Sequence, residues 1–115
     1  MKVEFYDLPD GSEPAKDFLD TLDLKMQAKM VMEIQLLEDL GTSLRIPYSE
    51  HLEDGIFELR AKVSTNISRV MYFFYVGDKA ILTNGFLKKS QKTPKAEIEN
   101  AKRYRADYLK RKGNG

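Results

Sequence analysis

The side chains in this chain that could do chemistry are cationic, and they gather in its second half. Arg60 ends a short alternating segment, and Arg69 interrupts the most apolar stretch of the sequence. Three lysines then stand immediately before a predicted helix: Lys88, Lys89 and Lys92. Because the first turn of a helix exposes unpaired N–H groups, it favours an anion nearby. These arginines, lysines and amides predict a site for a phosphate group.

Arg69 admits two interpretations, since a charge inside a buried strand is costly unless it is paired or faces a cavity. It either pairs with a carboxylate such as Glu58 on a neighbouring strand, or it lines a cleft that receives an anion. Phe86, just before the lysines, also has two interpretations. Its ring either belongs to the core or stacks on a base of a single strand, a mode that RNA recognition favours.

Most other catalytic chemistries lack their residues here. The chain has no cysteine and a single histidine, His51, which excludes thiolate catalysis, cysteine metal sites and a histidine pair. The glycine motifs that cradle phosphates, the H-E-x-x-H zinc motif and the G-x-S-x-G serine motif are also absent. The sequence therefore predicts no metal and no cofactor, and we expect His51 to be a surface or packing residue.

The net charge of +1 conceals an uneven distribution. Residues 1–59 carry 5 basic and 14 acidic side chains, whereas residues 60–115 carry 14 basic and 4 acidic ones. A polarity of this kind is evidence about partners. The basic half either binds an anion such as a nucleic-acid backbone, or pairs with the acidic half inside the fold.

A single domain over residues 1–115 is expected from the length and from the 42% of hydrophobic residues. Hydrophobic periodicity and turn residues predict a strand at 2–6, helices at about 12–22 and 23–41, strands at 56–62, 67–76 and 79–87, and a helix at 94–112. Residues 42–55 are expected to form a loop. Thr93 and Pro94 are expected as the N-cap and the first residue of the last helix.

This β-αα-βββ-α order predicts an α+β fold with a small twisted, mainly antiparallel sheet. The first strand must join the later three, because an isolated strand is not stable. We expect the N-terminal helical hairpin on one face of the sheet, and the other face to be partly open or lined by the last helix. No segment approaches the ~18 consecutive apolar residues of a membrane span, and we expect no signal peptide. The absence of cysteine allows a reducing cytoplasm without proving it, and the cytoplasm is the location that we expect.

Three blocks of sequence resemble one known family: LEDGIFELR at residues 52–60, RVMYFF at 69–74 and GFLKKSQKTP at 85–94. In this order and spacing they resemble the phage-derived, HigB-like branch of the RelE/ParE toxin superfamily, and the similarity extends over roughly residues 1–110. The resemblance implies a RelE-like fold and the toxin of a type II toxin–antitoxin pair. RelE-like members are endoribonucleases that cut translated mRNA at the ribosome without a metal ion. A partner antitoxin, often a helix-turn-helix protein, restrains them.

The resemblance also implies roles for particular residues. The family's two arginines fall on Arg60 and Arg69, which we expect to clamp the phosphate. Lys88 and Lys89 are expected to supply electrostatic stabilisation and proton transfer. The expected RNA-binding residues are an aromatic ring, a lysine and four cations of the last helix: Phe86, Lys92, Lys102, Arg103, Lys110 and Arg111.

One position departs from the family's pattern, since many relatives have a histidine where this chain has Asn84. An amide does not titrate, so either the lysines carry the proton transfer or the enzyme is weaker. Two other functions stay open: a ParE-like toxin that acts on DNA gyrase, and a nonenzymatic RNA- or protein-binding module. The lysine run and Arg69 favour RNA cleavage over an action on gyrase.

Overall fold

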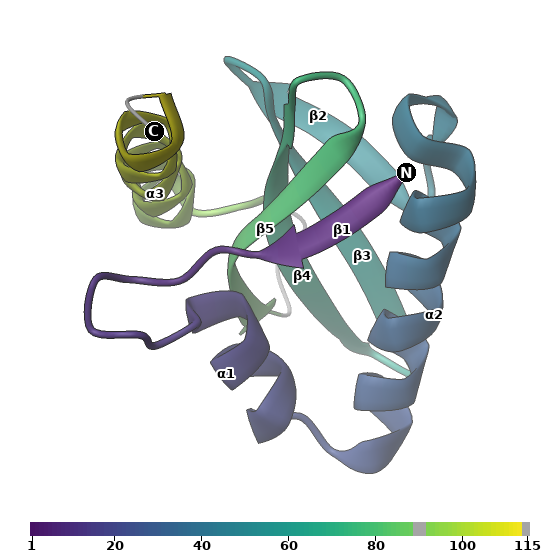
Figure 1. The fold of residues 1–115 in the computed structure, drawn as a ribbon. Helices are drawn as coiled ribbons and strands as arrows, with labels where there is room; N and C mark the ends of the chain where they lie inside the picture. The colour runs from purple at the N-terminus through teal and green to yellow at the C-terminus, as the bar shows by residue number, and fades with distance from the viewer. Residues whose placement is uncertain (89–91, 114–115) are drawn as a thin grey trace.

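The described residues form an α+β fold of three α-helices and five strands in the order β-αα-ββββ-α, arranged as Figure 1 shows. The computed structural model describes residues 1–88 and 92–113. Its elements are β1 (Lys2–Phe5), α1 (Pro14–Thr21), α2 (Leu24–Leu40), a 3-10 turn (Gly41–Ser43), β2 (Ser49–Glu53), β3 (Ile56–Val63), β4 (Asn66–Tyr75), β5 (Lys79–Lys88) and α3 (Lys95–Gly113). None of the helices in the described part of the chain combines the length and the hydrophobicity that crossing a membrane requires.

The five strands form one sheet in the order β1-β5-β4-β3-β2. Neighbours from β2 to β5 are antiparallel, whereas β1 runs parallel to β5, with Lys2 opposite Lys79. The prediction that the first strand joins the later ones is therefore confirmed. The most apolar segment becomes β4 at the centre of the sheet, where residues 68–73 are buried.

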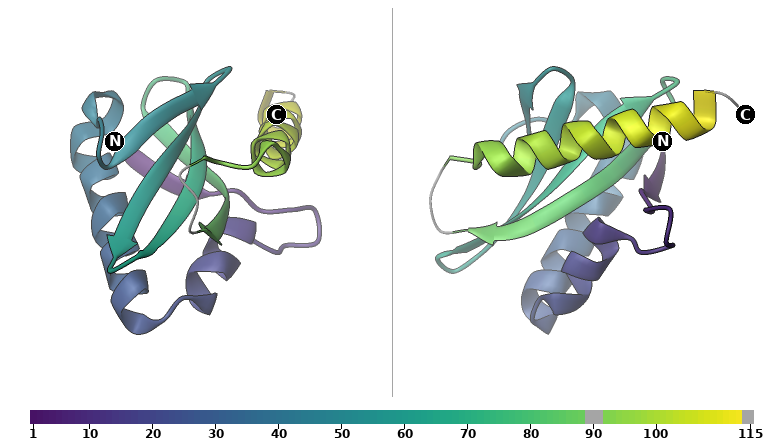
Figure 2. Two further views of the ribbon diagram at one scale, coloured as in Figure 1. Left: turned by 180° about the vertical axis from the view of Figure 1, so that it is seen from behind. Right: turned by 90° about the vertical axis from the view of Figure 1, so that its left-hand side faces the viewer.

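Helices cover both faces of the sheet (Figures 1 and 2). The two N-terminal helices lie on one face, with α1 near β5 and α2 over β3, and α3 crosses the opposite face. Of the two arrangements expected for that second face, the one lined by the last helix is present. Asp23 caps α2, as predicted, because its Oδ1 accepts a hydrogen bond from the backbone N–H of Met26 at 2.8 Å.

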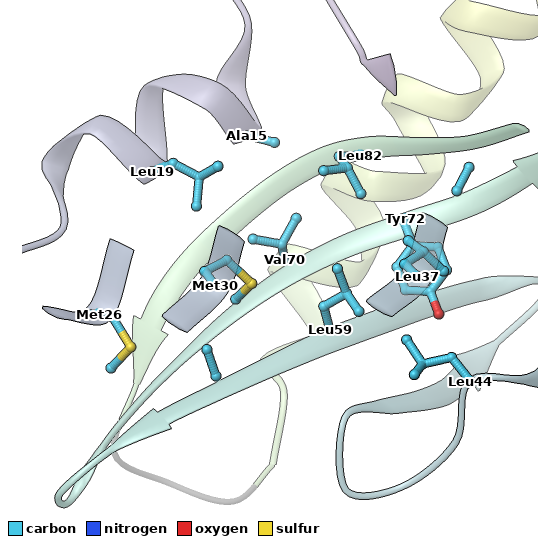
Figure 3. Close-up of a cluster of buried hydrophobic side chains, with 12 residues drawn as sticks. Ala15, Leu19, Met26, Met30, Leu37, Leu44, Leu59, Val70, Tyr72 and Leu82 are labelled. Carbon is cyan, nitrogen blue, oxygen red and sulfur yellow. The ribbon is translucent and has the colours of Figure 1, made fainter. Parts of the chain in front are cut away.

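Side chains alternate along the strands and so build a separate core on each face. Under α1 and α2, Val70 and Tyr72 of β4 pack with Leu59, Leu82 and residues of α2, as Figure 3 shows. Under α3, the intervening strand residues Ile56, Met71, Phe73 and Ile81 pack with Ala101 and Tyr108 of the helix. The methionines of α2 that face the sheet, Met26 and Met30, are buried core residues, in agreement with the sequence.

The structure differs from the sequence-based expectation at two places. The loop predicted for residues 42–55 is wrong for residues 49–53, which form the edge strand β2 against β3. The hydroxyl of Ser49, buried at the start of β2, is hydrogen-bonded to the hydroxyl of Tyr72. The last helix begins at Lys95, one residue later than expected.

The β4–β5 pair is irregular between Val70 and Tyr72, and Gly85 lies opposite Val70. Replacing Gly85 by alanine should destabilise the fold by roughly 1–3 kcal/mol, the usual cost of overpacking a core. A Cβ atom on Gly85 would lie 2.3 Å from Cδ2 of Phe18 and 3.0 Å from the carbonyl oxygen of Arg69. Urea denaturation measures the loss. In a Phe18→Ala background the penalty should shrink, and an equal penalty in both backgrounds contradicts this explanation.

Candidate functional site

The strand register brings three of the predicted site residues into one row. Arg60 of β3 lies opposite Arg69 of β4, which lies opposite Phe86 of β5. Residues paired in this way point to the same face of a sheet. Here it is the face covered by α3, because Phe86 packs at the edge of the core beneath that helix. Phe86 is only partly buried, so its ring belongs partly to the core and partly to the surface.

A buried carboxylate holds the two arginines of this row. The side chain of Glu58 is fully buried, and its Oε1 accepts hydrogen bonds from Nε of Arg60 at 2.7 Å and from Nη1 of Arg69 at 3.4 Å. Its Oε2 accepts a hydrogen bond from the hydroxyl of Thr93, which in turn accepts one from Nη1 of Arg69 at 3.0 Å. The ion pair across adjacent strands, one of the two interpretations of Arg69, is therefore present.

The two arginines differ in what they offer to a ligand. Arg69 is 2% exposed, so its guanidinium lies beneath the surface and orients the groups around it. The side chain of Arg60 is 26% exposed, and its Nη2 contacts Oε2 of Glu50 on the edge strand β2. Because an exposed ion pair of this kind contributes little free energy, the Arg60 contact with Glu50 can be exchanged for another anion.

Arg60 lies where two clefts meet. One, the Tyr48 cleft, has a volume of about 520 Å³ and is lined by Lys29, Glu33, Pro47, Tyr48, Arg60, Lys62, Ser64 and Ile67. The other, the Thr93 cleft, has a volume of about 280 Å³ and is lined by Glu50, His51, Leu52, Glu53, Arg60, Lys92, Thr93 and Ile98. A strand of nucleic acid bound at Arg60 would have a cleft on each side.

Of the three predicted lysines, only Lys92 has a described side chain. Lys89 lies outside the described residues. Lys88 is the last residue of β5, paired with Ile67, and its side chain lies outside the described part of the structure. Lys92 is exposed and lines the Thr93 cleft beside Arg60. Of the three lysines, the structure thus brings Lys92 to the arginine row and leaves the roles of Lys88 and Lys89 as predictions.

Asn84 joins β5 to the start of α3. Its Nδ2 donates to the carbonyl oxygen of Glu97 at 3.2 Å and to Oε1 of the same residue at 3.1 Å, and its Oδ1 accepts from the hydroxyl of Thr83 at 2.7 Å. The amide is 6% exposed. At this position the chain has a buried polar link between strand and helix rather than a titrating group.

The four predicted cations of α3 are spread along the helix. Lys102 pairs with Glu53, which raises the pKa of the lysine, and Arg111 pairs with Asp107 at 2.8 Å and with Asp7 at 3.9 Å. Arg103 is exposed, and its guanidinium lies 5.7 Å from the ring centroid of Tyr104. Lys110 is exposed. These residues lie apart from the arginine row and offer a separate, partly neutralised surface.

Ion pairs between the acidic and the basic half explain much of the uneven charge. Such pairs join Arg60 to Glu50, Lys79 to Glu4, Lys102 to Glu53, Arg105 to Asp54 and Arg111 to Asp7. Many basic residues are thus paired with acidic residues inside the fold. This pairing is the alternative to anion binding that the sequence left open. Lys62, Arg103 and Lys110 are among the exposed cations of the basic half.

Sequence reasoning missed three residues of this region: Glu33, Tyr48 and Glu50. Glu33 could have been found, because it falls on the buried stripe of α2 between Met30 and Leu37. Burial raises the pKa of this carboxyl, and the charge of Lys29 opposes that rise. No pattern in the sequence points to Tyr48 or Glu50 as site residues, because both lie in the segment predicted to be a loop.

His51 is a structural residue of the β2–β3 turn. Its Nε2 accepts a hydrogen bond from the backbone N–H of Gly55 at 3.1 Å, and its ring meets the edge of Phe57 with 5.0 Å between centroids. Among residues 1–88 and 92–113, no group of three or more histidine, aspartate or glutamate side chains is placed to hold a metal ion.

A five-stranded sheet with helices on both faces and an arginine row beside two clefts defines a small α+β domain. Within that class, the chain belongs to the family of phage-derived Gp49-like proteins (DUF891), which it matches over residues 17–106. This family is related to the HigB and RelE toxins. No curated protein matches the chain.

Replacing Glu58 by glutamine should lower the free energy of unfolding by about 3–5 kcal/mol, because two arginines lose the negative charge between them. Urea denaturation measures this loss. Glu53→Gln is the matched control, since Glu53 is half-exposed and pairs only at the surface with Lys102. That control should cost less than about 1 kcal/mol. Equal effects of the two variants contradict a central role for Glu58.

Proposed function

We propose that this chain is the toxin of a type II toxin–antitoxin pair, and that it is a ribosome-dependent mRNA endoribonuclease. Membership of a family related to the HigB and RelE toxins supports this class of function. The observation that carries the proposal is Arg60, a partly exposed guanidinium held by the buried Glu58 at the junction of two clefts. Such a fixed cation is suited to one phosphodiester of an RNA strand.

The proposed reaction uses the substrate's own nucleophile. The 2′-hydroxyl loses its proton to a base and attacks the adjacent phosphorus, and the bond to the 5′-oxygen breaks. The 5′-oxygen takes a proton from an acid, so the products are a 2′,3′-cyclic phosphate and a 5′-hydroxyl. Negative charge grows on the phosphoryl oxygens in the transition state, where a preorganised cation contributes most. Arg60 supplies that cation in this scheme. Arg69 is a positioning residue, because it acts through Glu58 and Thr93.

The proton carriers in this scheme are lysines. Lys88 and Lys89 keep the electrostatic and proton-transfer roles implied by the resemblance, since neighbouring ammonium groups disfavour each other's charge. Lys92 contacts the RNA backbone from the Thr93 cleft. Asn84 stays outside the proton transfer, because its amide is engaged with Glu97 and does not titrate.

The partners in this proposal are the ribosome with its mRNA and a cognate antitoxin, expected to be a helix-turn-helix protein. Exposed cations of α3 such as Arg103 and Lys110 add affinity for ribosomal RNA, with Lys102 and Arg111 contributing less because they are already paired. The proposed site of action is therefore the cytoplasm, where translating ribosomes are found.

Replacing Arg60 by alanine should reduce mRNA cleavage by about 10²–10³-fold, the usual cost of one preorganised donor to a transition-state oxyanion. The test is induced expression scored for growth arrest and for cuts in translated mRNA. Lys2→Ala is the control, because this exposed lysine lies on β1, away from the arginine row. DNA damage with intact mRNA would instead indicate a gyrase-directed toxin, and RNA binding without any cleavage a nonenzymatic module.

Replacing Glu50 by glutamine should tighten the binding of short single-stranded RNA a few-fold. The carboxylate of Glu50 occupies Nη2 of Arg60, so an incoming phosphate must displace it. The free energy of an exposed pair, about 0.2–1 kcal/mol, sets the size of the gain. Asp54→Asn is the matched control, because it removes the same charge but releases Arg105. Equal gains in both variants would indicate net charge rather than competition at Arg60.

A further inference from the structure

The Tyr48 cleft is lined by three cations, one carboxylate and several apolar groups. Lys29, Arg60 and Lys62 supply the charge, and Glu33 is the one carboxylate among the described residues that line it. Pro47 and Ile67 contribute apolar surface, as does the ring of Tyr48, which is 41% exposed. A volume of about 520 Å³ lies within the range of about 300–1,000 Å³ typical of small-molecule pockets.

Glu33 sets the direction in which an anionic ligand can lie. Its side chain is 2% exposed, and its Oε1 lies 3.6 Å from Nζ of Lys29. Its Oε2 has no hydrogen-bond partner among the described residues. A carboxylate repels an anion and favours a group that bears an N–H. A ligand therefore places its negative charge beside Arg60 and Lys62, away from Glu33.

Backbone hydrogen bonds fix the position of Tyr48, whose aromatic ring lines the cleft. Its carbonyl oxygen accepts the backbone N–H of Arg60 at 2.9 Å, and its own N–H donates to the carbonyl oxygen of Arg45 at 3.0 Å. These bonds hold the residue where β2 meets β3. An anchored aromatic ring beside cations is the arrangement on which bases of single-stranded nucleic acid stack.

We propose that the Tyr48 cleft binds one nucleotide unit of an RNA strand, with the base against Tyr48 and the phosphate between Arg60 and Lys62. This inference rests on the proposed function, because that function supplies RNA as the ligand. Because Arg60 lines both clefts, the phosphate of this nucleotide is the phosphodiester that Arg60 holds, and its base lies in the Tyr48 cleft. Tyr48 and the cleft around it are thus the determinants of preference for the base at that position.

The test is equilibrium binding of adenosine 5′-monophosphate and guanosine 5′-monophosphate to the isolated full chain, without ribosomes. Two further probes each carry one part of the nucleotide: ribose 5-phosphate has the phosphate without a base, and adenosine has the base without a phosphate. Both nucleotides should bind more tightly than either half. Their addition should shift the backbone amide resonances of Tyr48, Lys62 and Ile67 in the NMR spectrum of the unaltered protein.

Three variants separate stacking from charge. Tyr48→Ala should weaken nucleotide binding by roughly 5- to 100-fold, the effect of losing one stacked base, while Tyr48→Phe should retain it. Lys62→Ala should weaken only the probes that carry a phosphate. Lys25→Ala is the matched control, because Lys25 is exposed on α2 one turn before Lys29 and lines neither cleft. It should leave binding unchanged.

The inference is overturned if the nucleotides bind no more tightly than ribose 5-phosphate, or if Tyr48→Ala binds them as the unaltered chain does. Its failure is distinguishable from a failure of the proposed function. A chain that binds nucleotides through Tyr48 but cuts no mRNA supports this inference and contradicts the nuclease. A chain that cuts mRNA at unchanged positions after Tyr48→Ala, and binds no nucleotide, contradicts this inference alone.

Discussion

The site depends on one buried carboxylate. Arg60 and Arg69 lie opposite each other on adjacent strands, and like charges in that position repel. Glu58 lies between them and also binds Thr93, in the segment that leads into α3. A single side chain thereby ties β3, β4 and the entrance of the last helix together. Because a buried charge is costly unless it is fully partnered, these groups hold each other in one arrangement.

That arrangement separates two arginines that look alike in the sequence. Burial leaves Arg69 at 2% exposure as part of the scaffold, whereas Arg60 reaches the surface and remains in contact with Glu50. The result is an inner cation that fixes geometry and an outer cation that can meet a ligand. The two arginines therefore differ in role because they differ in depth. Arg69 supports the site from below the surface, and Arg60 is accessible to a ligand.

Local patterns in the sequence predicted most of the fold. The alternating residues predicted β3, the apolar run predicted β4, and Asp23 predicted the start of α2. The edge strand β2 could not be predicted in the same way. Its residues, Ser49–Glu53, are mostly polar, and they form a strand because β3 offers them a partner and Tyr72 a hydrogen bond.

The candidate site was predictable only in part. The arginines and lysines stood out by type and spacing, and Glu58 was visible as one partner for Arg69. The Tyr48 cleft could not be predicted, because it joins α2, the segment before β2 and the turn after β3, which meet only in three dimensions. Nor did the charge distribution show which cations pair within the chain. Lys102 and Arg105 find their carboxylates, Glu53 and Asp54, about fifty positions earlier in the sequence.

The parallel pairing of β1 with β5 has a consequence for how the molecule is made. Among the described residues, β1 has one sheet neighbour, β5, which comes much later in the chain, with Lys2 opposite Lys79. Until that late segment has been synthesised, the amides and carbonyls of β1 have no strand to bond, and the sheet lacks one edge. Closing so long a loop makes the last step of assembly a nonlocal one. Until β5 has formed, proteases therefore meet an incomplete sheet, and a product truncated before β5 leaves β1 without a strand to pair with.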